Sequence, residues 1–203
     1  LEPKKFKKTN WLLNQVEVCP YNNKMILPVM VDETLTQQIY RKNPHSEKTI
    51  IEGQKTEGVN NFIQTGELMN TMLKDVFSSI DIYDDQIRLL QARFTSPIGK
   101  DAIQFYRYYI VDTVKVERDS CFHLQFLPNN QQDFGFRGDI YILKDSSYQV
   151  KRCQLTIPRR SDVNFVENLR VDQEFTQLPN GEWVLSVDDM IVEMKIASFL
   201  HKI

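Results

Sequence analysis

Hydrophobic and polar residues alternate with a period of two through most of the second half of the chain. This alternation is typical of strands with one buried face. Polar turn sequences interrupt it, and Asn180-Gly181 is a strong hairpin signal. Short connections between consecutive strands predict an antiparallel meander. The predicted strands cover residues 105–118, 121–128, 134–144, 148–158, 163–177 and 182–197.

The first half of the chain mixes strand and helix patterns. Three early segments, WLLNQVEV, MILPVMVDETLTQQIYRK and EKTIIEGQKTEG, read as strands. Pro28 predicts an edge position or a bulge in the second of them. In TGELMNTMLKDVFSSI the apolar residues stand three and four apart, which predicts a helix over 65–80. Shorter helices are predicted in DDQIRLLQ and in SPIGKDAIQF.

The alternation assigns each side chain of the meander to an apolar or a polar face. Val114 and Val116 fall on the apolar face, and His123, Arg152 and Glu174 fall on the polar face. The apolar face is rich in aromatic residues. Because a large sheet coils as it twists, its concave side could be filled by the helix at 65–80 or left hollow for an apolar ligand. The alternative is a plain packed core, the usual role of an aromatic stripe. The candidate ligand-binding residues are Tyr106, Tyr108, Phe122, Phe126, Phe134, Phe136, Phe165 and Phe175.

These patterns predict an α+β fold: a large curved antiparallel β-sheet, forming a half-barrel meander, with helices packed on its concave face. By fold-level analogy this architecture is similar to that of the lipoprotein-localisation proteins, which shelter acyl chains. The length of 203 residues fits a single domain, 1–203.

Two short motifs suggest binding functions that the strand pattern argues against. Arg137-Gly138-Asp139 is the tripeptide of many adhesion ligands, but here both charges are expected on a flat mid-sheet strand, so no integrin-type receptor is predicted. Phe134 and Phe136 suggest the aromatic strand of an RNA-binding sheet, but the basic residue and glycine that should precede them are missing. Core packing is the better interpretation of both aromatic residues.

Composition and charge exclude further classes. The net charge is −2, with 25 basic and 27 acidic residues, which gives no electrostatic reason to expect nucleic acid or an acidic membrane surface. No apolar run is long enough to cross a bilayer as a helix, and no signal peptide is visible. Since the chain starts at Leu1, we interpret it as a domain excised from a longer protein.

Candidate chemistry is sparse. Asp84-Asp85 and Asp188-Asp189 could be acid/base pairs, but adjacent aspartates point apart and are more often solvated. Cys121 and His123 stand two residues apart, as a nucleophile and base could, but no third member is evident. With 3 cysteines, no C-x-x-C and scattered histidines, neither a metal nor a cofactor is predicted. Cys121 and Cys153 fall on opposite faces, so no disulfide between them is expected.

Several separated segments resemble one known family, in order. They are TEGVNNF, DIYDDQIRLL, SPIGKDAIQFYRYYIVDT, CFHLQFLPNNQQDFGFRGDIYI and VKRCQLTIPRRSDVNFVENLRVDQEFTQLPNGEWVLSVDDMIV. The family is a domain of unknown function in outer-membrane-associated proteins of Gram-negative bacteria. In those proteins a carboxypeptidase-regulatory-like domain precedes this region and a membrane β-barrel follows it. The resemblance extends from about Val16 to Ile196 and implies a periplasmic middle domain; it carries over no catalytic residues.

The resulting functional hypothesis is a non-enzymatic periplasmic domain of an outer-membrane-associated protein. It would bind a lipid, a lipoprotein or another envelope component in its concave face. The alternative is a purely structural spacer between a β-sandwich domain and a membrane barrel. A hydrolase would need convergent polar groups in one pocket, and the sequence offers no such set.

Overall fold

The computed structural model describes residues 14, 16–19, 22–41, 43–44, 46–57, 80–89, 92–130, 132–157 and 166–194. The contacts divide the chain into two compact units. One contains the described residues up to Glu57, and the other contains those from Ile80 onward. The single-domain organisation stays a prediction.

The described residues of the first unit form two antiparallel strand pairs. Strands β1 (Glu17–Val18) and β2 (Met25–Ile26) form a short pair, and β3 (Val31–Arg41) and β4 (Ser46–Glu57) form a long hairpin. The strand predictions for MILPVMVDETLTQQIYRK and EKTIIEGQKTEG are therefore confirmed. Pro28 lies between β2 and β3 and belongs to neither strand.

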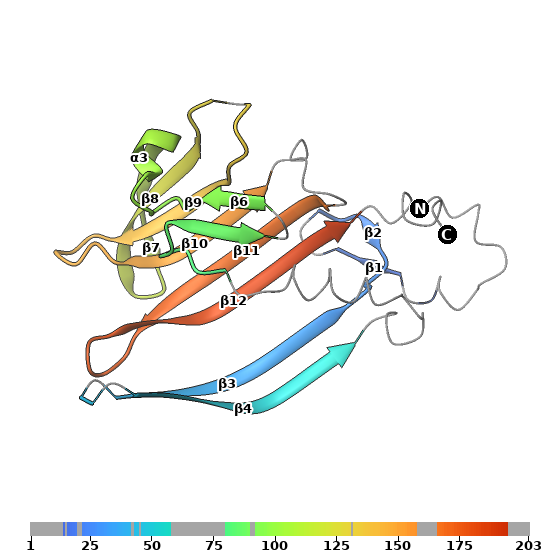
Figure 1. Cartoon of the computed structure of the whole chain (residues 1–203), viewed down its shortest axis with the longest axis horizontal. Helices are drawn as coiled ribbons and strands as arrows, with labels where there is room; N and C mark the ends of the chain where they lie inside the picture. Colours follow the sequence, from blue (N-terminus) through green and yellow to red (C-terminus); the bar gives the residue numbers. More distant parts are fainter. Residues whose placement is uncertain are drawn as a thin grey trace. The chain divides into compact units, whose positions relative to one another are not determined.

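The second unit is built on a six-stranded antiparallel sheet in the order β12-β11-β10-β9-β8-β7 (Figure 1). Each strand pairs with its neighbour in sequence, so the predicted meander is confirmed. The predicted Asn180-Gly181 turn falls between the last two strands of the sheet. The strands are β7 (Tyr106–Val116), β8 (Asp119–Pro128), β9 (Arg137–Leu143), β10 (Val150–Ile157), β11 (Val166–Gln177) and β12 (Trp183–Met194).

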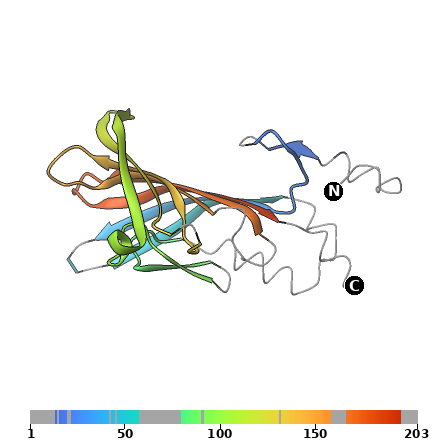
Figure 2. The same cartoon turned by 90° about the horizontal axis from the view of Figure 1, so that it is seen from above.

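A small hairpin and one helical turn cover the apolar face of this sheet. Strands β5 (Gln86–Leu89) and β6 (Ala92–Thr95) pair with each other, and helix α3 (Ala102–Phe105) leads directly into β7 (Figure 2). Phe94 of the hairpin packs on Phe136, with ring centroids 4.8 Å apart. The hydroxyl of buried Tyr106 donates to the Thr95 carbonyl at 2.6 Å. These contacts produce one continuous apolar core.

The predicted α+β fold is wrong, because the described chain is almost entirely β. Its one helix, α3, has 4 residues, and no helix packs on a concave face in the described ranges. The DDQIRLLQ segment forms β5 rather than a helix: Ile87 and Leu89 are buried while Gln86 and Arg88 are exposed, a period of two. The short helix predicted in SPIGKDAIQF is confirmed as α3. The helix predicted over 65–80 lies outside the described residues, apart from Ile80.

In the described part of the six-stranded sheet, four β-bulges change which face the later residues of a strand occupy. The register shifts at Val111 in β7, at Lys151 in β10, at Glu167 in β11 and at Ser186 in β12. A bulge inserts one extra residue and reverses the alternation beyond it. Val114 and Val116 therefore lie on the polar face of the sheet, and the prediction that placed them on the apolar face is wrong.

The Arg137-Gly138-Asp139 tripeptide lies at the start of β9, within the sheet, as predicted. A Cβ atom added to Gly138 would approach the Gln154 carbonyl oxygen to 1.8 Å. Only glycine fits this position, so its presence has a packing explanation. Both phenylalanines before β9 were predicted to pack in the core. Phe136 is buried, which confirms the prediction, but Phe134 is 53% exposed, so the prediction is wrong for that residue.

Candidate functional site

A row of polar side chains crosses the face of the sheet opposite the core. The strand register places Asp112, His123, Tyr141, Arg152 and Glu174 side by side on β7, β8, β9, β10 and β11. Three of the four bulges lie next to this row. Val111 and Lys151 immediately precede Asp112 and Arg152, and Ser186 immediately precedes Val187, the partner of Glu174. Because bulges bend strands and increase twist, the sheet is bent at the level of this row.

The end of the β7–β8 hairpin arches over this face. Lys151 of β10 holds it there: its ammonium lies 2.8 Å from Glu117 and 3.4 Å from Asp119, both at the tip of the hairpin. The Lys151 side chain is only 8% exposed. Burial works against its charge, but the hydrogen bonds and charges of the two carboxylates outweigh burial and raise the pKa of Lys151. The same contact lowers the pKa of Glu117. We call this three-residue cluster the hairpin latch.

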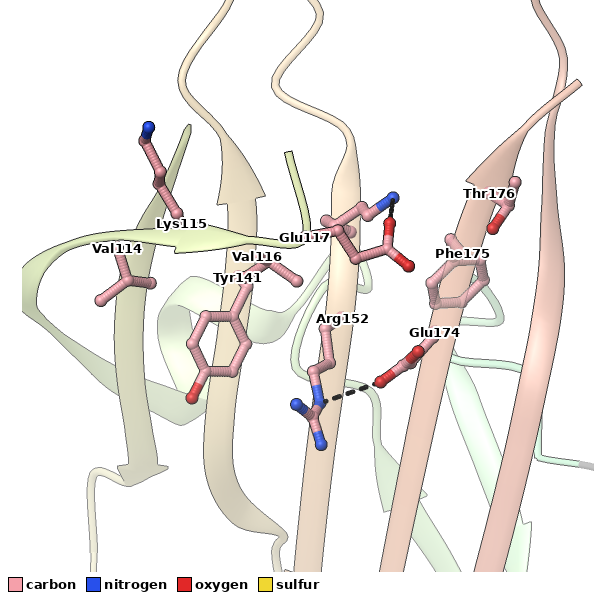
Figure 3. Close-up of a pocket in the computed structure, with 10 residues that line it drawn as sticks. Val114, Lys115, Val116, Glu117, Tyr141, Arg152, Glu174, Phe175 and Thr176 are labelled. Atoms are coloured by element: carbon pink, nitrogen blue, oxygen red, sulfur yellow. Dashed lines mark ion pairs between the residues drawn. The ribbon is translucent and has the colours of Figure 1, made fainter. Parts of the chain in front are cut away.

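A cavity of about 400 Å³ lies between the arched hairpin and the sheet (Figure 3). Such a volume is within the range of about 300–1,000 Å³ found for small-molecule sites. Val114 and Val116 of the hairpin point towards the row that carries Tyr141 and Arg152. The lining residues are Val114, Lys115, Val116, Glu117, Tyr141, Lys151, Arg152, Glu174, Phe175 and Thr176.

A second cavity of about 290 Å³ adjoins the first and shares Lys151 and Thr176 with it. Trp183 forms part of its wall, and the Lys151 ammonium lies 5.8 Å from the centre of the Trp183 indole. The hairpin latch therefore stands between the two cavities, and neither cavity is walled by apolar residues alone.

Arg152, a charged group on the wall of the larger cavity, is only partly satisfied. Its Nε lies 3.6 Å from a Glu174 carboxylate oxygen, which is too long for a hydrogen bond. Within the part of the chain that the structure describes, this buried Nε has no hydrogen-bond partner. The Arg152 side chain as a whole is 34% exposed. The guanidinium group therefore retains the capacity to donate hydrogen bonds to another acceptor.

The polar row does not form a catalytic set with Cys121. The two ring nitrogens of His123 face Asp112 at 3.1 Å and Asp139 at 2.7 Å, and its ring stacks on Tyr141 at 4.7 Å between centroids. The Cys121 thiol instead contacts the carbonyl of Asp119 at 3.8 Å. Burial raises the pKa of this thiol, which disfavours the nucleophilic thiolate.

The other candidate groups are also dispersed. Asp188 faces Gln173 on the core side of β12, whereas Asp189 pairs with Asp172 on the opposite face. Asp85 forms an ion pair with Lys100 at 2.9 Å. Cys19, Cys121 and Cys153 are buried and free. The described residues contain no cluster of side chains able to hold a metal ion.

The aromatic residues predicted as ligand contacts occupy several environments. Tyr106, Phe126, Phe136 and Phe175 are buried in the core, and Phe175 also lines the larger cavity. Tyr108 is half-buried, and its hydroxyl donates to the Pro97 carbonyl at 2.6 Å. Phe122 is half-buried beneath the Lys144 ammonium, and Phe134 is exposed. Phe165 lies outside the described residues. A ligand-binding role for these residues stays a prediction.

Sequence reasoning missed the residues that build the cavity. Val114 and Val116 were assigned to the wrong face, and Lys151 and Arg152 were not singled out as a site. The bulges that bring them together carry no proline or glycine signal, since Val111, Lys151 and Ser186 stand at the bulged positions. The close spacing of Glu117 and Asp119, with one basic residue between them, is the only trace in the sequence of the hairpin latch.

Comparison with known proteins identifies a family but no individual relative. No curated protein and no solved structure matches the chain. None of the helices in the described part of the chain is long and apolar enough to cross a membrane. One family model, a "Family of unknown function (DUF5686)", matches residues 3–202. The match covers nearly the whole sequence, and the chain therefore belongs to this family of unknown function.

Proposed function

We propose that this chain is a non-enzymatic ligand-binding domain on the periplasmic side of an outer-membrane-associated protein. The observation that carries the proposal is the cavity of about 400 Å³ beneath the β7–β8 hairpin. It is large enough for a small ligand and combines apolar, aromatic and charged walls. The ligand would be an envelope component that enters between the hairpin and the polar row of the sheet.

The chemistry of the polar face supports binding rather than catalysis. Cys121 and His123, the only nucleophile–base candidate that we identified in the sequence, contact different partners. His123 is engaged by carboxylates on both ring nitrogens, and the buried Cys121 thiol has a raised pKa. A nucleophile needs a base within hydrogen-bond reach, and this pair lacks that contact.

The proposed location has a different basis. It depends on the resemblance of the sequence to the middle domain of outer-membrane-associated proteins that begin with a carboxypeptidase-regulatory-like domain. Under this proposal, a lipid or a lipoprotein is a chemically reasonable ligand, because both are abundant in the envelope and both combine apolar chains with polar groups.

The second candidate is a purely structural spacer, and the packed apolar face favours it. Tyr106 and Phe126 meet edge to face at 5.3 Å between centroids, and Phe94 and Phe136 stack at 4.8 Å. Each is at most 2% exposed. A core of this kind transmits force and position without a ligand. The cavity on the opposite face is the feature that a spacer would not need.

An extraction experiment separates the two candidates. The chain is purified after incubation with an envelope lipid extract, extracted with organic solvent, and examined by mass spectrometry against a mock purification. Val116→Phe fills the cavity, and Thr113→Phe is the matched control because Thr113 lies on the other face of β7. A stoichiometric species in the wild type and Thr113→Phe, but not in Val116→Phe, supports binding. Empty extracts from all three proteins overturn it and favour the spacer.

A further inference from the structure

The geometry points to an acidic amphiphile as the occupant of the cavity beneath the β7–β8 hairpin, with its acidic group held by Arg152 and its apolar chain beneath Val114 and Val116. This inference rests on the proposed function, since it assigns the ligand class of the same cavity. It names Arg152, on β10, as the residue that selects the headgroup.

Arg152 is a cation of the polar row that can accept a new partner. Its guanidinium lies between the Tyr141 ring and the Glu174 carboxylate in Figure 3, and the strand register makes the three residues cross-strand neighbours. The nearest approach to Glu174 is 3.6 Å, and the two side chains are 34% and 38% exposed. An exposed ion pair of this length stabilises the fold only weakly. A carboxylate or phosphate with bidentate geometry would be a better partner for the planar guanidinium.

Lys151, the neighbouring cation, is already committed. Its ammonium contacts Glu117 at 2.8 Å and Asp119 at 3.4 Å, and its side chain is almost fully buried. An acidic group at Lys151 would have to displace two carboxylates and open the hairpin. The latch therefore closes one end of the cavity. Of the other two cations in the lining, Lys115 lies on the opposite face of β7 from Val114 and Val116, and Arg152 belongs to the polar row, so Arg152 is the anchor for a headgroup.

The rest of the lining suits an apolar chain. Val114 and Val116 form the roof and point towards the sheet, as Figure 3 shows, and Phe175 contributes a further apolar surface. Burial of ligand methylene groups against these side chains would make a ligand with an apolar tail bind more tightly than its headgroup alone. The ligand class is thus one that carries both parts, an acidic head and an apolar tail.

A basic headgroup fits this cavity less well. The two carboxylates on its wall, Glu117 and Glu174, both face cations. An amine at Glu117 would have to displace Lys151, and an amine at Glu174 would lie beside the Arg152 guanidinium and be repelled by it. An uncharged headgroup would be tolerated but would leave the hydrogen-bonding capacity of Arg152 unused.

The test uses three probes that share one chain and differ in the headgroup: decanoate, decanol and decylamine. Binding to the 203-residue chain is measured by titration calorimetry below the concentration at which the probes form micelles. We expect decanoate to bind about tenfold tighter than decanol, the effect of roughly one charge-assisted contact. Decylamine should bind weakest. Decyl phosphate, titrated in parallel, distinguishes a phospholipid-type head from a fatty-acid head.

Two arginine variants locate the headgroup. Arg152→Gln should lower the affinity for decanoate to that for decanol and leave decanol binding unchanged. Arg137→Gln is the matched control, because Arg137 carries the same charge on the same face of the sheet but does not line the cavity. It should leave all affinities unchanged.

The results test two hypotheses separately: that Arg152 binds an acidic headgroup, and that the cavity binds a ligand. Equal binding of decanoate and decanol, tightest binding of decylamine, or an unchanged decanoate affinity in Arg152→Gln overturns the role of Arg152. If decanol still binds and Val116→Phe abolishes that binding, the cavity remains a ligand site and only the acidic headgroup is refuted. If no probe binds and the extracts described above are also empty, the proposed function itself fails.

Discussion

Replacing Gly138 with alanine is the sharpest test of the sheet on which the cavity is built. Gly138 pairs with Phe126 on one side and with Leu155 on the other. A Cβ atom at this position would lie 1.8 Å from the Gln154 carbonyl oxygen and 2.9 Å from the carbon of the same carbonyl. Real Cβ contacts are essentially never shorter than 3.0 Å, so β9 and β10 would have to separate.

The energetic cost follows from that separation. Overpacking a well-packed interior costs about 1–3 kcal/mol, and each weakened ladder hydrogen bond adds roughly 1 kcal/mol. The lower backbone entropy of unfolded alanine returns only about 0.4–1 kcal/mol. We therefore expect Gly138→Ala to lower the free energy of unfolding by about 3 kcal/mol. For a chain of this size, that corresponds to a fall of about 6–12 °C in the melting temperature.

Gly53→Ala is the matched control. Gly53 also lies in a strand, β4, but an added Cβ would meet nothing within 4 Å. Its free energy of unfolding should change by less than about 1 kcal/mol, in the stabilising direction. Urea denaturation followed by circular dichroism measures both variants. If the free energy of unfolding of Gly138→Ala lies within about 0.5 kcal/mol of that of the control, β9 and β10 are not paired in the register described. The cavity, which is built on these strands, would then lack its structural basis.

Three further predictions concern single side chains. Lys151→Met removes the hairpin latch, so amide hydrogen exchange in the β7–β8 hairpin should accelerate about tenfold while β5 and β6 are unaffected; unchanged exchange would contradict the latch. Burial raises the pKa of Asp188 in the folded state, so its ionisation above the unfolded value of 3.8 opposes folding as the pH rises. Asp188→Asn should therefore raise the melting temperature at pH 7 but not at about pH 3, and a gain of equal size at both pH values would refute the assignment. Burial also raises the pKa of the Cys153 thiol, so iodoacetamide at pH 8 should label it in urea but not in the native protein, and rapid native labelling would exclude this burial.

The strands of the meander could be predicted from the sequence because each carries its own alternation and is bounded by polar turns. Phe122, Leu124 and Phe126 share a face in β8, as the period of two requires. Leu155 and Ile157 in β10 and Leu169 and Val171 in β11 do the same, and all four are buried. These predictions succeed because they depend only on local order along the chain.

The failures arise where non-local contacts decide the structure. In DDQIRLLQ four residues form β5, and so short an apolar pattern cannot distinguish one helical turn from a strand. Pairing with β6 and packing against the core decide in favour of the strand. The prediction of the site residues failed for a related reason. The bulge at Val111 reverses the face of every later residue in β7, and the local alternation does not indicate this bulge.

The edge of the sheet at β12 has a consequence for the pairing of this protein with strands of other molecules. Within the described ranges, β12 pairs only with β11 and is an edge strand of the six-stranded sheet. Two devices that discourage edge-to-edge aggregation occur together in it: a bulge at Ser186 and a carboxylate, Asp188, that faces the core side of the sheet. An incoming strand would have to follow the irregular backbone and bury that charge. We therefore expect Asp188, whose pKa is raised in the folded chain, to hinder the pairing of another strand with β12.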